Sequence, residues 1–191
     1  HSTDNSYQIV SQITSDKIKL VKNPRKGACA ARNHGFSISK GEYIQYLDAD
    51  DLIATSKIEN QLQLINVKEN NLIAFGDWFR FYDTIEESLH PSTFLYKDYN
   101  QPLNCLIDCW NGKGMIPVHS WLTPSHLIKK AGEWNESLVH NQDGEFFSRV
   151  LIHADRLKFC ADSIVYYRTG IEGSISSGNK NKIQAASQLY S

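Results

Sequence analysis

Apolar positions in the first 82 residues alternate between extended and helical spacing. Short apolar runs predict strands at residues 17–21, 43–47 and 72–76, and the run at 78–82 either continues the last of these strands or pairs with it. Apolar side chains that recur every three or four residues predict helices: one carrying Tyr7 and Ile13, one at 28–39 and one at 55–69. This alternation is typical of an α/β domain with helices on both faces of a mostly parallel sheet. Such domains usually open with a strand, so we expect a first strand to precede His1.

The second half has a less regular pattern. Residues 83–120 carry turn residues and isolated aromatic side chains, as in a lid or binding loop. Further elements are predicted after it: a strand at 120–123, a helix at 125–132, a helix from Asp143 to Ala154, short strands at 157–160 and 163–167, and a terminal helix at 178–191.

Composition narrows the class of protein. The 191 residues include 20 Lys and Arg against 21 Asp and Glu, a net charge of −1, which argues against a nucleic-acid partner held by bulk positive charge. No apolar run reaches the length of about 18 residues that a membrane span needs, and the first residues do not resemble a signal peptide. We therefore expect a cytoplasmic protein whose four cysteines are reduced.

Three acidic residues follow the strand predicted at 43–47. Asp48 and Asp50 are two positions apart, so in an extended chain they point to the same side. Ligands of open α/β sheets bind at the carboxyl ends of strands. Two carboxylates there suit Mg²⁺ or Mn²⁺, which takes its remaining ligands from phosphate and water. The alternative is a solvated acidic turn that caps the next helix.

Residues 27–51, GACAARNHGFSISKGEYIQYLDADD, resemble the family 2 glycosyltransferases, which have the GT-A fold. The family pattern is a Gly, an Ala-Arg-Asn with a nearby Gly, and a Gly-x-Tyr-Ile strand that ends in Asp-x-Asp. Further segments resemble the family in the expected order, at residues 2–6, 132–149 and 166–176. The resemblance implies a Rossmann-like mixed sheet with helices on both faces.

The resemblance also implies roles for residues near the acidic motif. Asp50 would bind the Mg²⁺ or Mn²⁺ ion, with Asp48 assisting through the ribose or a metal-bound water. Residues expected to bind the donor are Gly27, Arg32, Asn33, Asp48 and Asp51. For Asp51, the alternative is an N-cap of the helix at 55–69.

By the same resemblance, Asp143 is the general base that accepts the proton of the attacking hydroxyl. The family's usual Glu-Asp pair here reads Gln142-Asp143. Asp143 heads a predicted helix, so an N-cap role is the alternative. Trp121 and His119 are expected to contact the acceptor, because an aromatic face can stack on a sugar, although a core position for Trp121 is equally compatible with the sequence.

The predicted protein is therefore one domain, with residues 1–82 as the nucleotide and metal half and 83–191 as the acceptor half. It would be an inverting glycosyltransferase that moves a sugar from a nucleotide-diphosphate donor, most simply a UDP-sugar, to a sugar or lipid-linked acceptor in cell-surface polysaccharide or glycolipid synthesis. Peripheral association with the inner face of the membrane fits this function. The alternatives are an incomplete or inactive donor-binding module and a haloacid-dehalogenase-type phosphatase.

Overall fold

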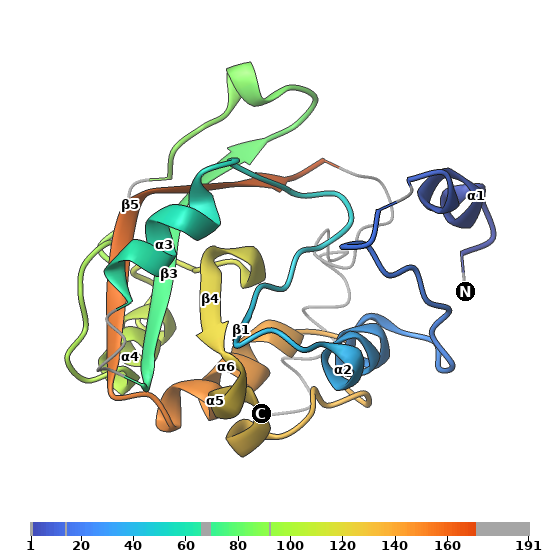
Figure 1. Ribbon diagram of the computed structural model, residues 1–191. Coiled ribbons are helices and arrows are strands. Elements are labelled where there is room, and N and C mark those ends of the chain that lie inside the picture. The colour runs from blue at the N-terminus through green and yellow to red at the C-terminus, as the bar shows by residue number, and fades with distance from the viewer. Residues whose placement is uncertain (1, 14, 66–69, 92, 171–191) are drawn as a thin grey trace, which may run out of the picture.

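The computed structural model describes residues 2–13, 15–65, 70–91 and 93–170. Its helices are α1 (Ser6–Ser11), α2 (Ala28–Ile38), α3 (Lys57–Leu64), α4 (Leu103–Trp110), α5 (Ser125–Ala131) and α6 (Gln142–Ile152) (Figure 1). Its strands are β1 (Tyr43–Ile44), β2 (Leu52–Ile53), β3 (Leu72–Phe81), β4 (Trp121–Pro124) and β5 (Arg156–Arg168). Short 3₁₀ turns are η1 (Ile85–Glu87) and η2 (Val118–Ser120).

The strands form one mixed sheet in the order β1-β4-β3-β5-β2. Only the two long central strands, β3 and β5, run parallel, and the other three pairings are antiparallel. A parallel pair needs a long crossover connection, and the segment between β3 and β5 supplies one that carries α4, α5 and α6. The expectation of a mostly parallel sheet was wrong, whereas the mixed α/β class is confirmed.

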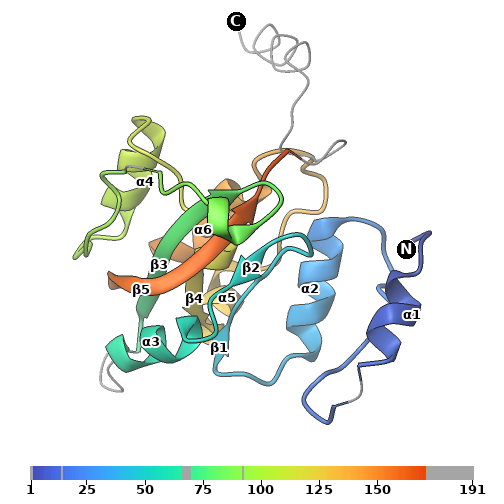
Figure 2. The ribbon, with the colours of Figure 1, turned by 90° about the horizontal axis from the view of Figure 1, so that it is seen from above.

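Helices cover both faces of this sheet, as the alternation predicted (Figure 2). Ile73 and Phe75 of β3 belong to the main core, where they join side chains of α5 and α6. Leu72 and Ala74 point to the other face and pack in a second cluster with Ile65, at the end of α3. Successive side chains of a strand point to opposite faces, so β3 is buried on both sides, as its nearly continuous apolar run indicates.

The central strands are longer than the sequence pattern suggested. Of the two alternatives for the run at 78–82, the structure has the continuation of 72–76, as the single strand β3, and the two short strands predicted at 157–160 and 163–167 form the one strand β5. The register between them shifts once, between Gly76 and Trp78. A Cβ atom on Gly76 would lie 1.9 Å from the backbone oxygen of Ser163, so only glycine allows this close approach.

Several predicted elements differ from the structure. The run at 17–21 is not a strand: Ile18, Leu20 and Val21 are exposed, and α1 buries none of its residues. The strand expected at 43–47 is only two residues long. The helix α4 was not predicted. The end of the helix expected at 55–69 and the terminal helix at 178–191 fall outside the described residues. Among the described helices, none is long and apolar enough to cross a bilayer.

Candidate functional site

The acidic residues form a tight turn, here called the acidic turn (residues 48–51), between β1 and β2. The Asp51 amide donates to the Asp48 carbonyl oxygen at 3.3 Å, which closes the turn. Asp50 is exposed and Asp48 is half-buried, whereas Asp51 is buried. The turn therefore has an outward side, with the carboxylates of Asp48 and Asp50, and an inward side, with the carboxylate of Asp51.

Arg32 connects the outward side of this turn to the start of α6. It extends from α2, and its Nη2 donates to Asp48 Oδ1 at 2.6 Å. Its Nη1 donates to Gln142 Oε1 at 3.2 Å, and the guanidinium lies over the Trp134 ring, 4.5 Å from the centroid. One side chain thus links the acidic turn to the residue that precedes Asp143.

Asp143 is the second residue of α6 and is half-buried. The N-cap position belongs to Asn141, which has φ 52°, so Asp143 is not the cap that the alternative reading proposed. No side chain or amide in the described part of the chain donates a hydrogen bond to its carboxylate. Asp143 can therefore accept a proton without losing a protein contact.

Two residues expected at the donor instead shape the backbone. Asn33 is buried: its Oδ1 accepts from the Trp134 amide at 2.8 Å, and its Nδ2 donates to the Trp134 carbonyl at 3.0 Å and to Glu136 Oε1 at 3.0 Å. With both polar atoms engaged, Asn33 fixes the segment before α6 against α2 and does not face a donor. Gly27 is the N-cap of α2 with φ 119°, a conformation that favours glycine.

The buried half of the acidic turn meets His119, which lies in η2. Asp51 Oδ1 accepts from the Arg168 amide at 2.8 Å, and Asp51 Oδ2 lies 3.0 Å from His119 Nδ1, outside good hydrogen-bond geometry. The His119 ring is fully buried and stacks on Tyr167. Burial raises the pKa of Asp51 to about 7 and lowers the pKa of His119 to about 4, because the interior disfavours either charge.

These contacts change the predicted roles of Asp51 and His119. Asp51 points away from solvent, so it anchors the turn and does not face a donor, and the helix α3 has Ser56 as its N-cap, not Asp51. His119 has no surface with which to touch an acceptor. Trp121 is also buried: it stacks on Phe147 with centroids 5.1 Å apart, so the structure places this ring in the core.

Arg168 holds the acidic turn from the strand β5. Its Nε donates to the Asp50 carbonyl oxygen at 3.0 Å and its Nη1 to the Tyr82 carbonyl oxygen at 2.9 Å. The guanidinium lies 4.3 Å from the centroid of the Phe81 ring. The turn is therefore tied to the ends of both central strands. Arg168 belongs to the segment 166–176, which resembles the family in sequence, although that resemblance alone implied no role for this arginine.

A cluster of buried polar side chains holds η2, which carries His119 next to Asp51 of the acidic turn. Lys57 is fully buried and its Nζ donates to Gln45 Oε1. Gln45 Nε2 donates to the His119 carbonyl oxygen at 2.9 Å, and Gln61 Nε2 to the Ser120 carbonyl oxygen at 2.9 Å. Burial lowers the pKa of Lys57 to about 7. The sequence shows these residues only as polar positions of ordinary spacing, so nothing in it marked the cluster.

The outward carboxylates are the candidate cation ligands. Within the described ranges, no three His, Cys, Asp or Glu side chains gather to form a metal site. Asp50 is exposed, its side chain makes no hydrogen bond to a described residue, and Asp48 Oδ2 lies outside the Arg32 bond. Carboxylate oxygens are the ligands that Mg²⁺ and Mn²⁺ prefer. The donor set therefore fits a cation that takes most of its ligands from a diphosphate and water.

The family model and the relatives that match this chain all point to glycosyltransferases. Residues 1–123 match the model of the family described as Glycosyl transferase family 2. An uncharacterised glycosyltransferase of Rickettsia felis is 30% identical over 147 residues, which cover 73% of this chain and 24% of that protein. The Escherichia coli protein WfaP, named as a UDP-Glc:alpha-D-GlcNAc-diphosphoundecaprenol beta-1,3-glucosyltransferase, is 41% identical over 69 residues, 36% of this chain and 28% of WfaP.

A solved structure shows the same fold. The crystal structure of S. aureus TarS 1-349 superimposes with a TM-score of 0.65 at 17% identity and covers 88% of this chain and 49% of that one. This likeness confirms the expected GT-A-type architecture. The chain spans about a quarter of the length of the two curated relatives given above. The family match covers well over half of the sequence, and the chain belongs to glycosyl transferase family 2.

Proposed function

We propose that this chain forms a large part of the catalytic domain of an inverting glycosyltransferase, with a nucleotide-diphosphate sugar as donor. The observation that carries the proposal is the Arg32 bridge, which brings the acidic turn and the start of α6 to one guanidinium. A diphosphate-binding group and a proton acceptor must lie near the same anomeric carbon, and the bridge supports this proposal because it joins Asp48 to Gln142, the residue before Asp143. UDP is the nucleotide we expect.

In this proposal Asp50 and Asp48 hold Mg²⁺ or Mn²⁺ at the exposed side of the acidic turn. The cation would neutralise the negative charge that develops on the leaving diphosphate. Arg32 orients the Asp48 carboxylate, because its short bond at 2.6 Å leaves Oδ2 as the free atom. Arg168 and Asp51 keep the backbone of the turn in place and touch neither substrate.

Asp143 is the proposed general base. The acceptor oxygen attacks the anomeric carbon, the bond from that carbon to the diphosphate oxygen breaks, and the hydroxyl proton passes to the Asp143 carboxylate. A single displacement of this kind inverts the anomeric centre. The carboxylate of Asp143 is not engaged by another described residue, which supports its availability for this step.

The acceptor is proposed to be a sugar, either free or lipid-linked. WfaP and the E. coli protein WfgD are both named as enzymes that act on a diphosphoundecaprenol-linked sugar. A lipid-linked acceptor would place the enzyme at a membrane surface, so we propose peripheral association at its inner face. The family membership removes the support for the phosphatase alternative.

Calorimetry with UDP and Mn²⁺ tests the proposal. We expect wild-type protein to bind UDP in the presence of Mn²⁺, with at least a tenfold loss of affinity in EDTA or in Asp50→Ala. Glu133→Gln, an exposed carboxylate on the segment before α6, is the matched control and should bind normally. Binding of equal strength in EDTA would contradict the cation role, and UDP binding without transfer to any acceptor would favour the donor-binding module.

A further inference from the structure

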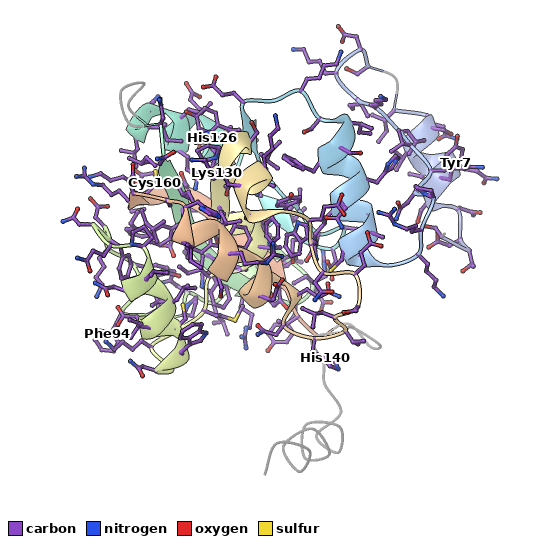
Figure 3. The ribbon with its side chains drawn as sticks, turned by 90° about the horizontal axis from the view of Figure 1, so that it is seen from below. Tyr7, Phe94, His126, Lys130, His140 and Cys160 are labelled. Atoms are coloured by element: carbon purple, nitrogen blue, oxygen red, sulfur yellow. The ribbon has the colours of Figure 1, made fainter. Side chains whose placement is uncertain are left out.

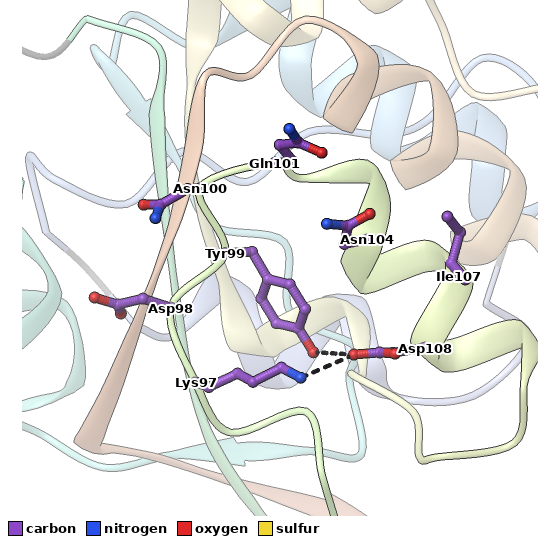
Figure 4. A pocket seen from close by; sticks show the side chains of 8 residues that line it. All are labelled: Lys97, Asp98, Tyr99, Asn100, Gln101, Asn104, Ile107 and Asp108. Atoms are coloured by element: carbon purple, nitrogen blue, oxygen red, sulfur yellow. Dashed lines mark hydrogen bonds and ion pairs between the residues drawn. The ribbon is translucent and has the colours of Figure 1, made fainter.

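A hollow that the transferase site does not use lies at the start of α4. It has a volume of about 540 Å³ and is lined by the segment 97–101 together with Asn104, Ile107 and Asp108 (Figure 4). Figures 1 and 2 both place α4 well apart from α2, which carries Arg32. The hollow is therefore a separate feature, and its lining indicates what kind of molecule it would bind.

The charged groups in and around the hollow are already paired. Asp108 accepts from Lys113 at 2.6 Å and lies 3.1 Å from Lys97 Nζ, and Asp98 pairs with Lys158 at 2.6 Å. The two lysines hold the pKa of Asp108 at about 2. No carboxylate or ammonium of the described lining is left without an opposite charge, so the hollow offers little attraction to a phosphate or a cation. Its chemistry favours a neutral ligand.

Three amide side chains in the lining are free to bind such a ligand. Asn100, Gln101 and Asn104 are exposed, and their side chains make no hydrogen bond to another described residue. In Figure 4 the side chains of Gln101 and Asn104 lie on one side of the Tyr99 ring, whose hydroxyl donates to Asp108 Oδ2 at the other end. An amide offers both donors and an acceptor, which matches the neighbouring hydroxyl groups of a sugar.

The solvent side of α4 is apolar where a surface helix is normally polar. Leu103, Ile107 and Trp110 recur at positions i, i+4 and i+7, and all three are exposed. Phe94, which is labelled in Figure 3, is exposed too and precedes the lining segment 97–101 in the chain. Exposed apolar groups that adjoin a hollow with well-placed polar groups mark a binding surface. A sugar ring has hydroxyl edges and C–H faces, and so matches both parts of this surface.

We propose that the hollow and the adjoining apolar side of α4 form a second site that binds a neutral oligosaccharide. The amides would bind hydroxyl groups of one sugar unit, and the next units would lie across Ile107 onto the Trp110 ring. Such a site would hold a glycan chain away from the donor site. This glycan could be part of a long acceptor chain. That role rests on the proposed function, whereas the binding of a glycan at this site does not.

Trp110 gives a direct way to test the proposal. It is 73% exposed, whereas the other three tryptophans are at most 4% exposed, so iodide should quench the fluorescence of Trp110 almost alone. We expect at least one of cellotetraose, maltotetraose and tetra-N-acetylchitotetraose, at millimolar concentration and without UDP or metal, to protect Trp110 from iodide. Absence of protection by all three would overturn the proposal.

Variants decide whether the protection comes from this site. The double variant Gln101→Ala, Asn104→Ala should weaken binding at least fivefold, because each amide loses its bonds to the ligand. Gln63→Ala removes an exposed amide from α3 and should bind as the wild type does. Thermal melting checks that all three proteins are folded. Equal affinity in the double variant would overturn the proposal, and because no donor is present either result leaves the donor-binding test independent.

Discussion

The outward and inward sides of the acidic turn use the same residue type for different purposes. Asp48 accepts from Arg32 through one oxygen and keeps the other free, and the carboxylate of Asp50 is exposed with no described partner. Asp51 is only 5% exposed; its carboxylate accepts from the Arg168 amide and lies beside the buried ring of His119. The difference shows that one backbone bond separates a residue available for chemistry from one that fixes the turn.

Two arginines show the same division. Arg32 contacts side chains on the outward side, so it can adjust the carboxylates that would meet a ligand. Arg168 contacts backbone carbonyls at the ends of the turn and of β3, so it sets where the turn lies. The account therefore predicts that changes on the outward side alter activity and that changes on the inward side alter stability.

The largest effect is expected outside the turn, at the proposed base. Asp143→Asn keeps the shape of the side chain but cannot accept the proton, so kcat should fall by about 10²–10⁴-fold. The affinity for UDP and the thermal midpoint should stay unchanged. Steady-state kinetics with the donor and a lipid-linked or free sugar acceptor measure this, with Glu133→Gln as the control. A loss of less than tenfold would remove Asp143 from this role.

On the inward side, Arg168→Met should lower the free energy of unfolding by about 2 kcal/mol, because two carbonyl bonds of a charged donor are lost. Arg80→Met is the matched control: Arg80 is exposed on β3, and its guanidinium lies 5.9 Å from the Trp78 ring without holding the turn. Urea denaturation of both variants gives the comparison. Equal losses in the two would show that Arg168 does not fix the turn.

The buried Lys57 should make the stability of the protein depend on pH. Burial lowers the pKa of Lys57 to about 7 in the folded chain, whereas an ordinary lysine has a pKa of about 10.5. Between these values the unfolded chain holds a proton that the folded one does not, so stability rises as pH rises. From pH 7 to pH 9 we expect a gain of about 2 kcal/mol, which Lys57→Met should abolish. Urea denaturation at the two pH values measures it, and an identical rise in both proteins would contradict the assignment.

The smallest effect is expected for Arg32→Met. The carboxylate of Asp48 and the start of α6 would lose their common partner, and kcat/KM for the donor should fall about tenfold, which corresponds to a loss of about 1.4 kcal/mol. Stability should change less than activity, because the Asp48 side chain of this pair is 39% exposed and ion pairs with an exposed partner contribute about 0–1 kcal/mol. Arg25→Met breaks an exposed pair with Glu136 and is the control. A fall in stability with unchanged kinetics would reverse the predicted division.

The sequence predicted the parts of the site that depend on local pattern. A strand that ends in aspartates, the Ala-Arg-Asn segment and the helix headed by Gln142 and Asp143 all have short-range signals, and the structure has α2, the acidic turn and α6 near those positions. The rule that residues i and i+2 share a side holds for an extended chain, whereas residues 48–51 form a turn that is closed by the bond from the Asp51 amide to the Asp48 carbonyl oxygen. A common side for Asp48 and Asp50 therefore stays a prediction.

The rest depends on tertiary contacts that no local pattern contains. Trp121 and His119 resemble surface recognition residues in the sequence, but β4 and η2 carry them into the core. The helix α4 has apolar side chains at helical spacing but exposes them and buries Asp108, and its eight residues are too short a stretch to mark a helix within an otherwise irregular segment. The run at 17–21 is apolar enough for a strand, yet no described strand lies beside it.

The most direct test of the central claim compares Asp50→Ala with Asp51→Ala in two measurements, Mn²⁺-dependent UDP affinity and the free energy of unfolding. The account predicts that Asp50→Ala loses at least tenfold in affinity and keeps its stability. Asp51→Ala should lose about 2 kcal/mol of stability, because the Arg168 amide is left without its acceptor, and should keep its affinity within about threefold. The opposite assignment, with Asp51 controlling UDP affinity and Asp50 controlling stability, would contradict it.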